Sequence, residues 1–401
     1  MSARARTVVL SISLLVILYV GLGGLLGRTT SEGAYRPLAV FSEVLSRIRS
    51  DYVEEPDIPR VAAGALHGML EELDPYSSYL SPREYAEYKQ KTETPQGGEV
   101  GVVLSKRFGL ISVVTVLPGS PAARAELQTG DILESIAGFS TREMSIEQAY
   151  LLLAGEPGTA VKVSVVRQAR AEPQALELVR ARPVPTRVLT TRLESDIVYL
   201  KIAAFTPGRA AEVRGALRQL QSQGARKLIL DLRDCATGTV EEAVETTRLL
   251  LPRGLIAYAQ GQQYPRQQFT ADPAQTLWNG PLTVLINSGT AGPAEILAGA
   301  LLDNTRGQVI GQPSYGVGTV QKLIPLEDGS AVILTVAKYY RPSGKAILEN
   351  AVTPSVAVEL PPDQALTPLP HALPPPGDPV VLKALEVLRA LPVTPAVPKA
   401  A

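Results

Sequence analysis

Apolar residues recur every three or four positions in two stretches near the start of the chain. After Ser31 they form the stripe Leu38, Val40, Phe41, Val44, Leu45 and Ile48. A second stretch runs from about Ile58 to Leu73 and ends at Asp74-Pro75, where proline cannot continue a helix. Because this spacing is that of one helix face, we expect residues 30–95 to form a helical N-terminal region. Four tyrosines near its end predict a packed aromatic patch: Tyr76, Tyr79, Tyr85 and Tyr88.

From about Gly97 the apolar and polar residues alternate with a period of two. These short runs predict strands at Val100–Leu104, Leu110–Leu117, Ile132–Ile136, Val161–Arg167 and Leu176–Arg180. One helix is expected among them at Ser145–Leu153, with the Ser145 hydroxyl as its N-cap. This content predicts one small, strand-rich domain over residues 96–184.

Strands and helices alternate from about Pro185 onwards. The predicted strands are Ile197–Ile202, Lys227–Leu232, Leu282–Ile286 and Gln308–Ile310, and the predicted helices are Pro207–Gln223, Val240–Leu251 and Pro293–Leu302. Such alternation is typical of α/β layering, so residues 185–360 are expected to form an α/β core. Residues 361–401 are expected to be a Pro-rich tail with one helix at about Asp378–Leu391. The predicted fold class is therefore α+β multidomain.

The composition limits the chemistry that the chain can carry. The 401 residues have a net charge of zero, whereas a protein that binds nucleic acid normally shows a basic face, so no nucleic-acid partner is expected. Cys235 is the one cysteine, and His67 and His371 are the two histidines. This content excludes an internal disulfide and argues against a metal site built on Cys or His. We expect no metal and no other cofactor, and we interpret Cys235 as a buried apolar side chain.

The first segment predicts export. Arg4 and Arg6 precede an uncharged run from Thr7 to Leu26. At about 1.5 Å per residue this run reaches across the roughly 30 Å core of a bilayer, and positive charge on its N-terminal side favours a cytoplasmic N-terminus. We expect residues 1–29 to be a single-pass anchor in the cell membrane, with the globular part extracytoplasmic. A cleaved signal peptide is the alternative interpretation.

The strings GGEVGVVL and PGSPAARAELQTGDILESIAG resemble a PDZ domain over about 85 residues. Such domains add the C-terminus of a peptide as a strand at a sheet edge and bind its carboxylate with backbone amides. The resemblance implies three groups of binding residues: the carboxylate loop with Gly97, Gly98 and Gly101, the start of the docking strand at Val100 and Val102, and a groove lined by Ala149, Leu152 and Leu153. A PDZ fold with a closed or unused groove is the alternative.

The remaining strings resemble the carboxyl-terminal processing, or tail-specific, peptidases. They are GALHGMLEELDPYSSYLSPREY, LILDLRDCATG, VLINSGTAGPAEILAGALLDNTRGQVIG, PSYGVGTVQKLIPLEDGS and LTVAKYYRPSGKAI. The order of helices, PDZ domain and α/β core also agrees with that family, and the resemblance covers residues 35–360 or so. It implies a Ser nucleophile activated by a Lys base, which must be held at a depressed pKa.

The residues that the family uses for catalysis are replaced in this chain. Gly292 stands at the nucleophile position and Val317 at the lysine position, while the accompanying glutamine is retained as Gln321. The residue after the nucleophile supplies an oxyanion amide in the family, but here it is Pro293, which has no N–H. The other donor comes from a glycine that is Thr237 here.

These replacements favour a pseudopeptidase that binds protein C-termini and has no catalytic residues. Its expected partners are peptides or protein C-termini, the membrane, and a second copy or an active paralogue. One alternative is an active endopeptidase that uses neighbouring groups such as Ser288, Thr290, Ser314 or Tyr315. A purely structural envelope protein is another.

Overall fold

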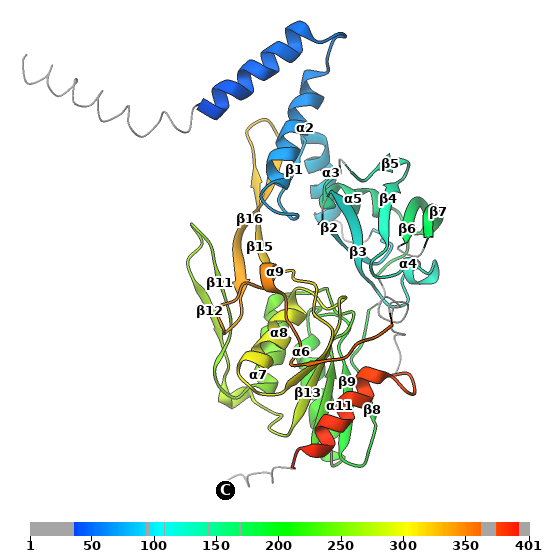
Figure 1. Ribbon diagram of the computed structural model, residues 1–401, viewed down its shortest axis with the longest axis vertical. Coiled ribbons are helices and arrows are strands. Elements are labelled where there is room, and N and C mark those ends of the chain that lie inside the picture. The colour runs from blue at the N-terminus through cyan, green and yellow to red at the C-terminus, as the bar shows by residue number, and fades with distance from the viewer. Residues whose placement is uncertain are drawn as a thin grey trace, which may run out of the picture. The chain divides into compact units, whose positions relative to one another are not determined.

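The computed structural model describes residues 36–93, 97–107, 109–142, 144–167, 170–183, 185–361 and 374–392. The chain divides into two compact units, Met1–Gly68 and Met69–Ala401 (Figure 1). The predicted anchor Thr7–Leu26 lies outside the described residues. Within those residues, no helix combines the length and the apolar character that crossing a membrane requires.

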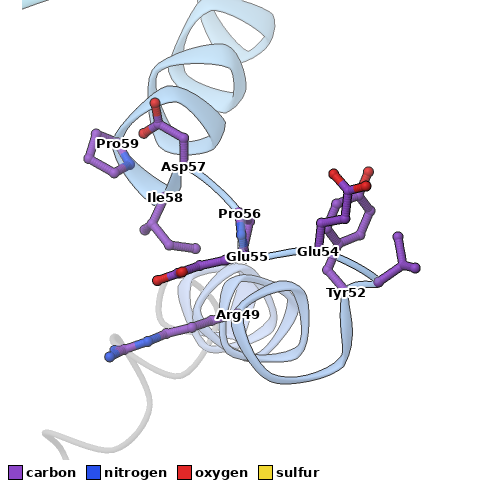
Figure 2. A pocket seen from close by; sticks show the side chains of 9 residues that line it. Arg49, Tyr52, Glu54, Glu55, Pro56, Asp57, Ile58 and Pro59 are labelled. Atoms are coloured by element: carbon purple, nitrogen blue, oxygen red, sulfur yellow. The ribbon is translucent and has the colours of Figure 1, made fainter.

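The first unit contains the two predicted N-terminal helices. One covers residues 36–51, and the other is α2 (Ile58–Glu71), which continues past the boundary between the units. The apolar stripe of the first helix is largely exposed; for example, Val44 is 51% exposed. A hollow of about 680 Å³ lies at the turn between the helices, and Figure 2 shows the carboxylates of Glu54, Glu55 and Asp57 around it. No residue of the predicted sites lies there.

Two elements that the pattern did not predict follow α2. They are the short strand β1 (Ser78–Leu80) and helix α3 (Pro82–Glu93). The predicted patch of four tyrosines is divided between two clusters: Tyr85 and Tyr88 pack with Leu80 and Ile333, whereas Tyr76 packs on the PDZ core. The prediction of a single aromatic patch is therefore wrong, because Tyr85 and Tyr88 on α3 and Tyr76 before β1 have different neighbours.

Residues 98–181 form the strand-rich domain that the sequence predicted. Its sheet has the order β2-β3-β4-β6-β7, with β5 beside β4. The elements are β2 (Val102–Arg107), β3 (Leu110–Val116), α4 (Pro121–Arg124), β4 (Ile132–Ile136), β5 (Phe139–Ser140), α5 (Ile146–Leu153), β6 (Ala160–Arg167) and β7 (Arg170–Val179). The Ser145 side chain accepts the Gln148 amide in a capping box, which confirms the predicted start of α5.

The core of the second unit is a six-stranded sheet in the order β17-β14-β13-β10-β9-β8. All neighbouring strands are parallel except β8 and β9. The strands are β8 (Leu189–Arg192), β9 (Ile197–Lys201), β10 (Lys227–Asp231), β13 (Leu282–Ile286), β14 (Gln308–Gly311) and β17 (Val356–Ala357). Every residue of β9, β10 and β13 is buried, as expected for parallel strands covered on both faces.

Helices cover both faces of this sheet, as Figure 1 shows. One face packs against α6 (Arg209–Ser222), α7 (Val240–Leu250) and α8 (Pro293–Asp303). The other face packs against α11 (Pro379–Ala390), whose Val381, Ala384 and Leu388 contact strand residues such as Ile229 and Leu285. The helix predicted in the tail is thus part of the hydrophobic core.

A second sheet has the order β1-β16-β11-β12, with β15 also paired to β16. It consists, besides β1, of β11 (Leu255–Gln260), β12 (Gln267–Thr270), β15 (Thr319–Pro325) and β16 (Ala331–Tyr340). The short helices η1 (Pro273–Gln275) and α9 (Ile347–Asn350) complete the core. The sequence did not predict this sheet. Its strand β15 follows the turn of Val317, and that turn is bonded to Glu295 on α8.

Candidate functional site

Gly292 lies at the start of α8, where the loop after β13 turns into the helix. Its backbone has φ 57° and ψ −118°, in the region that favours glycine, and Pro293 is the first residue of the helix. A Cβ placed on Gly292 would meet only the carbonyl oxygens of Ala236 and Val317, at 3.9 and 4.0 Å. The structure therefore leaves room for a side chain at this position and brings Gly292, Ala236 and Val317 together.

The turn that carries Val317 is held against α8 by one carboxylate, that of Glu295. Its Oε1 accepts the hydroxyl of Ser314 and the amide of Gly316, and its Oε2 accepts the amides of Gly292 and Val317, at 2.9 and 2.7 Å. The side chain is completely buried. Glu295 thus joins Gly292 to Val317, a role that the sequence did not predict.

Burial also changes the acidity of this carboxyl group. Desolvation raises the pKa of Glu295 to about 7, and the hydrogen bonds from Ser314, Val317, Gly292 and Gly316 oppose this rise. The two effects compete because the same pocket excludes water and supplies N–H and O–H donors. The clamp is therefore sensitive to pH near neutrality.

The loop with Thr237 forms the opposite side of the site. The Thr237 carbonyl accepts the Phe205 amide at 2.8 Å, and the Thr239 amide donates to the Phe205 carbonyl at 2.9 Å. Gly238 between them has φ 114°, and a Cβ there would lie 2.2 Å from the Phe205 backbone. Thr237 is consequently fixed by the backbone on both sides.

Two of the hydroxyls considered as substitute nucleophiles already have structural roles. Thr290 is fully buried and donates to the Leu232 carbonyl at 2.9 Å. Ser314 donates to Glu295 and accepts the Val352 amide at 2.7 Å. Ser288 is partly exposed and remains the hydroxyl of this loop with access to solvent.

Cys235 is buried in the main hydrophobic core. Desolvation raises the pKa of its thiol, which disfavours the reactive thiolate. This placement agrees with the interpretation of Cys235 as a buried apolar side chain.

Gln321 lies on β15, and its side chain is directed to Tyr76. Its side-chain amide donates to the Tyr76 carbonyl at 2.8 Å, so it helps to join β15 to the chain segment before β1. The next residue, Lys322, lines a hollow of about 450 Å³ with Tyr264 and Lys338. Neither Gly292 nor Val317 lines that hollow.

The glycines of the predicted carboxylate loop make backbone contacts within the PDZ domain. Gly98 pairs with Gly155 in both directions, and Glu99 pairs with Ala181. Gly101 lies so close to Ser120 that a Cβ would be 2.2 Å from the serine Cβ. Gly97 is exposed beside this pair. The amide of Gly98 is therefore already engaged within the domain.

The predicted groove lies between β2 and α5, and two details differ from expectation. Strand β2 begins at Val102, so Val100 lies before the docking strand; its carbonyl instead accepts the Ala122 amide at 2.9 Å. Ala149 and Leu153 belong to the PDZ core, at 0% and 3% exposure, while Leu152 is half-buried against it.

A tyrosine that the sequence did not single out joins α5 to β2. The hydroxyl of Tyr150, on α5, accepts the Leu104 amide of β2 at 2.8 Å. Burial raises the pKa of the Tyr150 hydroxyl, which keeps it protonated. The signal for this contact is absent from the local sequence, since the two residues are 46 positions apart.

The chain matches two family descriptions, peptidase family S41 over residues 196–358 and PDZ domain over residues 112–167. It is 32% identical to the carboxy-terminal-processing protease of Bartonella bacilliformis, with 82% of this chain and 77% of that protein covered. It is 30% identical to the carboxy-terminal processing protease CtpA of Bacillus subtilis, with 87% and 75% covered.

Among solved structures, the photosystem II D1 C-terminal processing protease is similar, with a TM-score of 0.68 and 27% identity over 80% of this chain and 92% of that one. The fold and the comparisons thus define a member of peptidase family S41 that carries a PDZ domain. The chain belongs to the carboxy-terminal processing protease family.

Proposed function

We propose that this chain is a catalytically inactive member of its family that binds protein C-termini through its PDZ domain. The observation that carries the proposal is that Gly292 and Val317 lie together, with both of their amides bonded to the Glu295 carboxylate. Peptide hydrolysis by this type of site needs a nucleophilic side chain and a base beside it. Gly292 offers no side chain, and Val317 offers an apolar one.

The oxyanion positions support the same proposal. Pro293 has no N–H at the helix start, where developing negative charge would be stabilised. Loss of one such donor typically raises the barrier by about 3 kcal/mol. This deficit would persist even if another hydroxyl took the place of the missing serine.

The second candidate function is an active endopeptidase that uses unconventional residues. Ser288 is the observation in its favour, because it is partly exposed in the loop before Gly292. Thr290 and Ser314 already donate buried hydrogen bonds, which disfavours their hydroxyls as nucleophiles. This function ranks second, because Pro293 supplies no oxyanion amide whichever hydroxyl attacks.

A proteolysis assay with the full-length protein separates these candidates. The protein in detergent is incubated with casein and with unstructured peptides, and the products are analysed by mass spectrometry beside an active relative. We expect no cleavage above that of buffer. Cleavage that persists through further purification and is lost in Ser288→Ala would replace the first candidate by the second.

A binding assay tests the PDZ part of the proposal. Fluorescent peptides from a C-terminal library are titrated with the full-length protein, each as the free carboxylate and as the C-terminal amide. We expect the carboxylate forms to bind more tightly, because backbone amides in such domains contact the carboxylate. Equal affinity of both forms, or binding by neither, would sink the proposal.

Membrane anchoring and export belong to the proposal as well. They rest on the uncharged run Thr7–Leu26 after Arg4 and Arg6. Cell fractionation of the full-length chain and of a variant without residues 1–29 tests them. We expect the first in the membrane fraction with its globular part accessible to added protease from outside; recovery of the full-length chain as a soluble cytoplasmic protein would exclude the anchor. Pairing with a second copy or an active paralogue can be measured by cross-linking in the same membranes.

A further inference from the structure

The outer edge of the PDZ sheet is formed by β2. In the sheet order β2 is terminal and pairs only with β3. N–H and C=O groups alternate in direction along a strand, so every second residue of an edge strand directs its amide away from the sheet. The register places Val103 opposite Thr115 and Leu104 opposite Val113, so the bulge is on β3 and β2 keeps its alternation.

The outward amide of Leu104 already has a partner. It donates to the Tyr150 hydroxyl at 2.8 Å, and Tyr150 comes from α5, the helix that forms the other wall of the groove. A peptide added as a strand beside β2 would present a backbone carbonyl to this amide. The Tyr150 oxygen therefore occupies the acceptor position that the peptide would need.

Helix α5 is held so that this contact is preformed. Its N-terminus has a capping box formed by Ser145 and Gln148. The Gln148 side chain also bonds to Glu84 on α3, and Lys91 of α3 donates to the Leu151 carbonyl. The Tyr150 ring itself packs on the PDZ core. The hydroxyl is thus positioned by the helix and its neighbours.

We infer that Tyr150 competes with a bound peptide for the Leu104 amide and thereby sets the affinity and selectivity of the groove. This inference rests on the proposed peptide-binding function. A peptide that makes only backbone contacts must displace the hydroxyl, whereas a peptide with a hydrogen-bonding side chain near its C-terminus gives the displaced hydroxyl a new partner. The groove accordingly favours C-termini that carry such a side chain.

The variant Tyr150→Phe tests the competition, because it keeps the packed ring and removes only the hydroxyl. A net intramolecular hydrogen bond is worth enough to change affinity by about 2- to 10-fold. We expect Tyr150→Phe to bind a C-terminal peptide with an all-alanine end more tightly by this factor, and to lose the preference for a serine or threonine near the end. Tyr264→Phe, which removes a hydroxyl from the second sheet, is the control and should bind as the parent protein does.

Hydrogen exchange at the Leu104 amide gives a second, peptide-free measurement on the full-length protein. We expect faster exchange of this amide in Tyr150→Phe than in the parent or in Tyr264→Phe, with no more than a small fall in melting temperature for the one lost hydrogen bond. If the parent protein binds peptides and Tyr150→Phe binds the all-alanine peptide equally or less tightly, the inference is wrong while the proposed function stands. If neither protein binds any peptide, the proposed function fails, and the exchange rate alone decides whether Tyr150 covers the edge.

Discussion

The Glu295 carboxylate accepts the Val317 amide at 2.7 Å, and this bond joins the start of α8 to the turn that carries Val317. The same carboxylate accepts the Gly292 amide at 2.9 Å. Gly292 and Val317 are therefore connected by a buried clamp, in which the Glu295 carboxylate contacts their backbone amides. Because backbone amides do not depend on side-chain identity, this clamp can form with Gly and Val at the two positions.

The clamp predicts a specific dependence of stability on pH. The pKa of Glu295 is raised from 4.5 to about 7 in the folded protein, so the folded state holds the proton more tightly than the unfolded state. The stabilisation is complete below the ordinary pKa and is lost as the pH rises to about 7, with a total of about 3 kcal/mol.

Urea unfolding of the full-length protein at several pH values, beside Glu295→Gln, measures this effect. We expect the free energy of unfolding of the parent to fall with rising pH more steeply than that of the variant between those two values. Parallel curves for the two proteins would mean that Glu295 ionises at its ordinary pKa and that its four donors only balance its burial.

Restoring the catalytic side chains is predicted to be insufficient. Gly292→Ser with Val317→Lys supplies a nucleophile and an amine, and the open space at Gly292 admits the serine. The serine must adopt φ 57°, which costs on the order of 1–2 kcal/mol, and Pro293 still provides no amide. We expect only weak peptidase activity, and an increase when Pro293→Ala is added.

A fluorogenic peptide assay and labelling with a fluorophosphonate measure this restoration. Adding Thr237→Gly to the triple variant tests the second oxyanion position in the same way. A double variant as active as a natural family member would show that the missing amide at Pro293 is unimportant.

Local signals in the sequence were sufficient to predict many elements. Ser145 with Gln148 marked the start of α5, and Pro293 marked the start of α8, because caps and first-turn prolines act within a few residues. Strands β9, β10 and β13 are fully buried and therefore consist largely of apolar residues, so they could be predicted from the sequence. The relation of Gly292 to Val317 also followed from the resemblance to the family.

Contacts between distant segments were not predictable in this way. The four donors to Glu295 come from Gly292 and from positions 314–317, and neither segment signals the other. Gln321 was expected beside the lost lysine, but β15 directs it to Tyr76. The contact of Tyr150 with Leu104 depends on how α5 packs on the sheet, which periodicity does not specify.

The C-terminal helix is predicted to be essential for folding. Asp378 caps α11 by accepting the Val380 amide at 2.9 Å, and it forms a 2.8 Å ion pair with Arg233. Both side chains are 4% exposed. Removing the Asp378 carboxylate takes away the cap and one of two partners of Arg233, whose guanidinium keeps its 2.6 Å ion pair with Asp231. We therefore expect a cost of about 2–4 kcal/mol, from the lost cap and one lost hydrogen bond between charged groups.

Chemical denaturation of Asp378→Ala measures this cost. Asp272→Ala removes a comparable cap from the short helix η1, where the Asp272 carboxylate accepts the Ala274 amide, and should cost only about 1 kcal/mol. If the two variants lose equal stability, the pair with Arg233 adds nothing beyond the cap.

Binding of a peptide carboxylate is predicted to strengthen as the pH falls. Burial raises the pKa of Glu147 on α5 and of Glu99 in the loop before β2, and both carboxyls act on Tyr150 in the groove. Each therefore takes up a proton above the ordinary value of 4.5, at a pH where the peptide carboxylate is still ionised. Less negative charge then faces the peptide. Lys91 and Arg180 also contact α5, through the carbonyls of Leu151 and Leu152.

Titrations of one carboxylate peptide between about pH 7.5 and about pH 4.5, with the parent protein and with Glu147→Gln, measure this effect. Lys91, Arg180 and Glu99 are common to both proteins, so the difference between them reports Glu147. We expect a tightening of about two- to five-fold in the parent, as for a like-charge contact of up to about 1 kcal/mol. In Glu147→Gln the affinity should be higher at neutral pH and should change less. An amidated peptide is the control, because without a carboxylate it should show little of this dependence; an equal change for both peptides would trace the effect to Tyr150 and the groove rather than to the charge of the ligand.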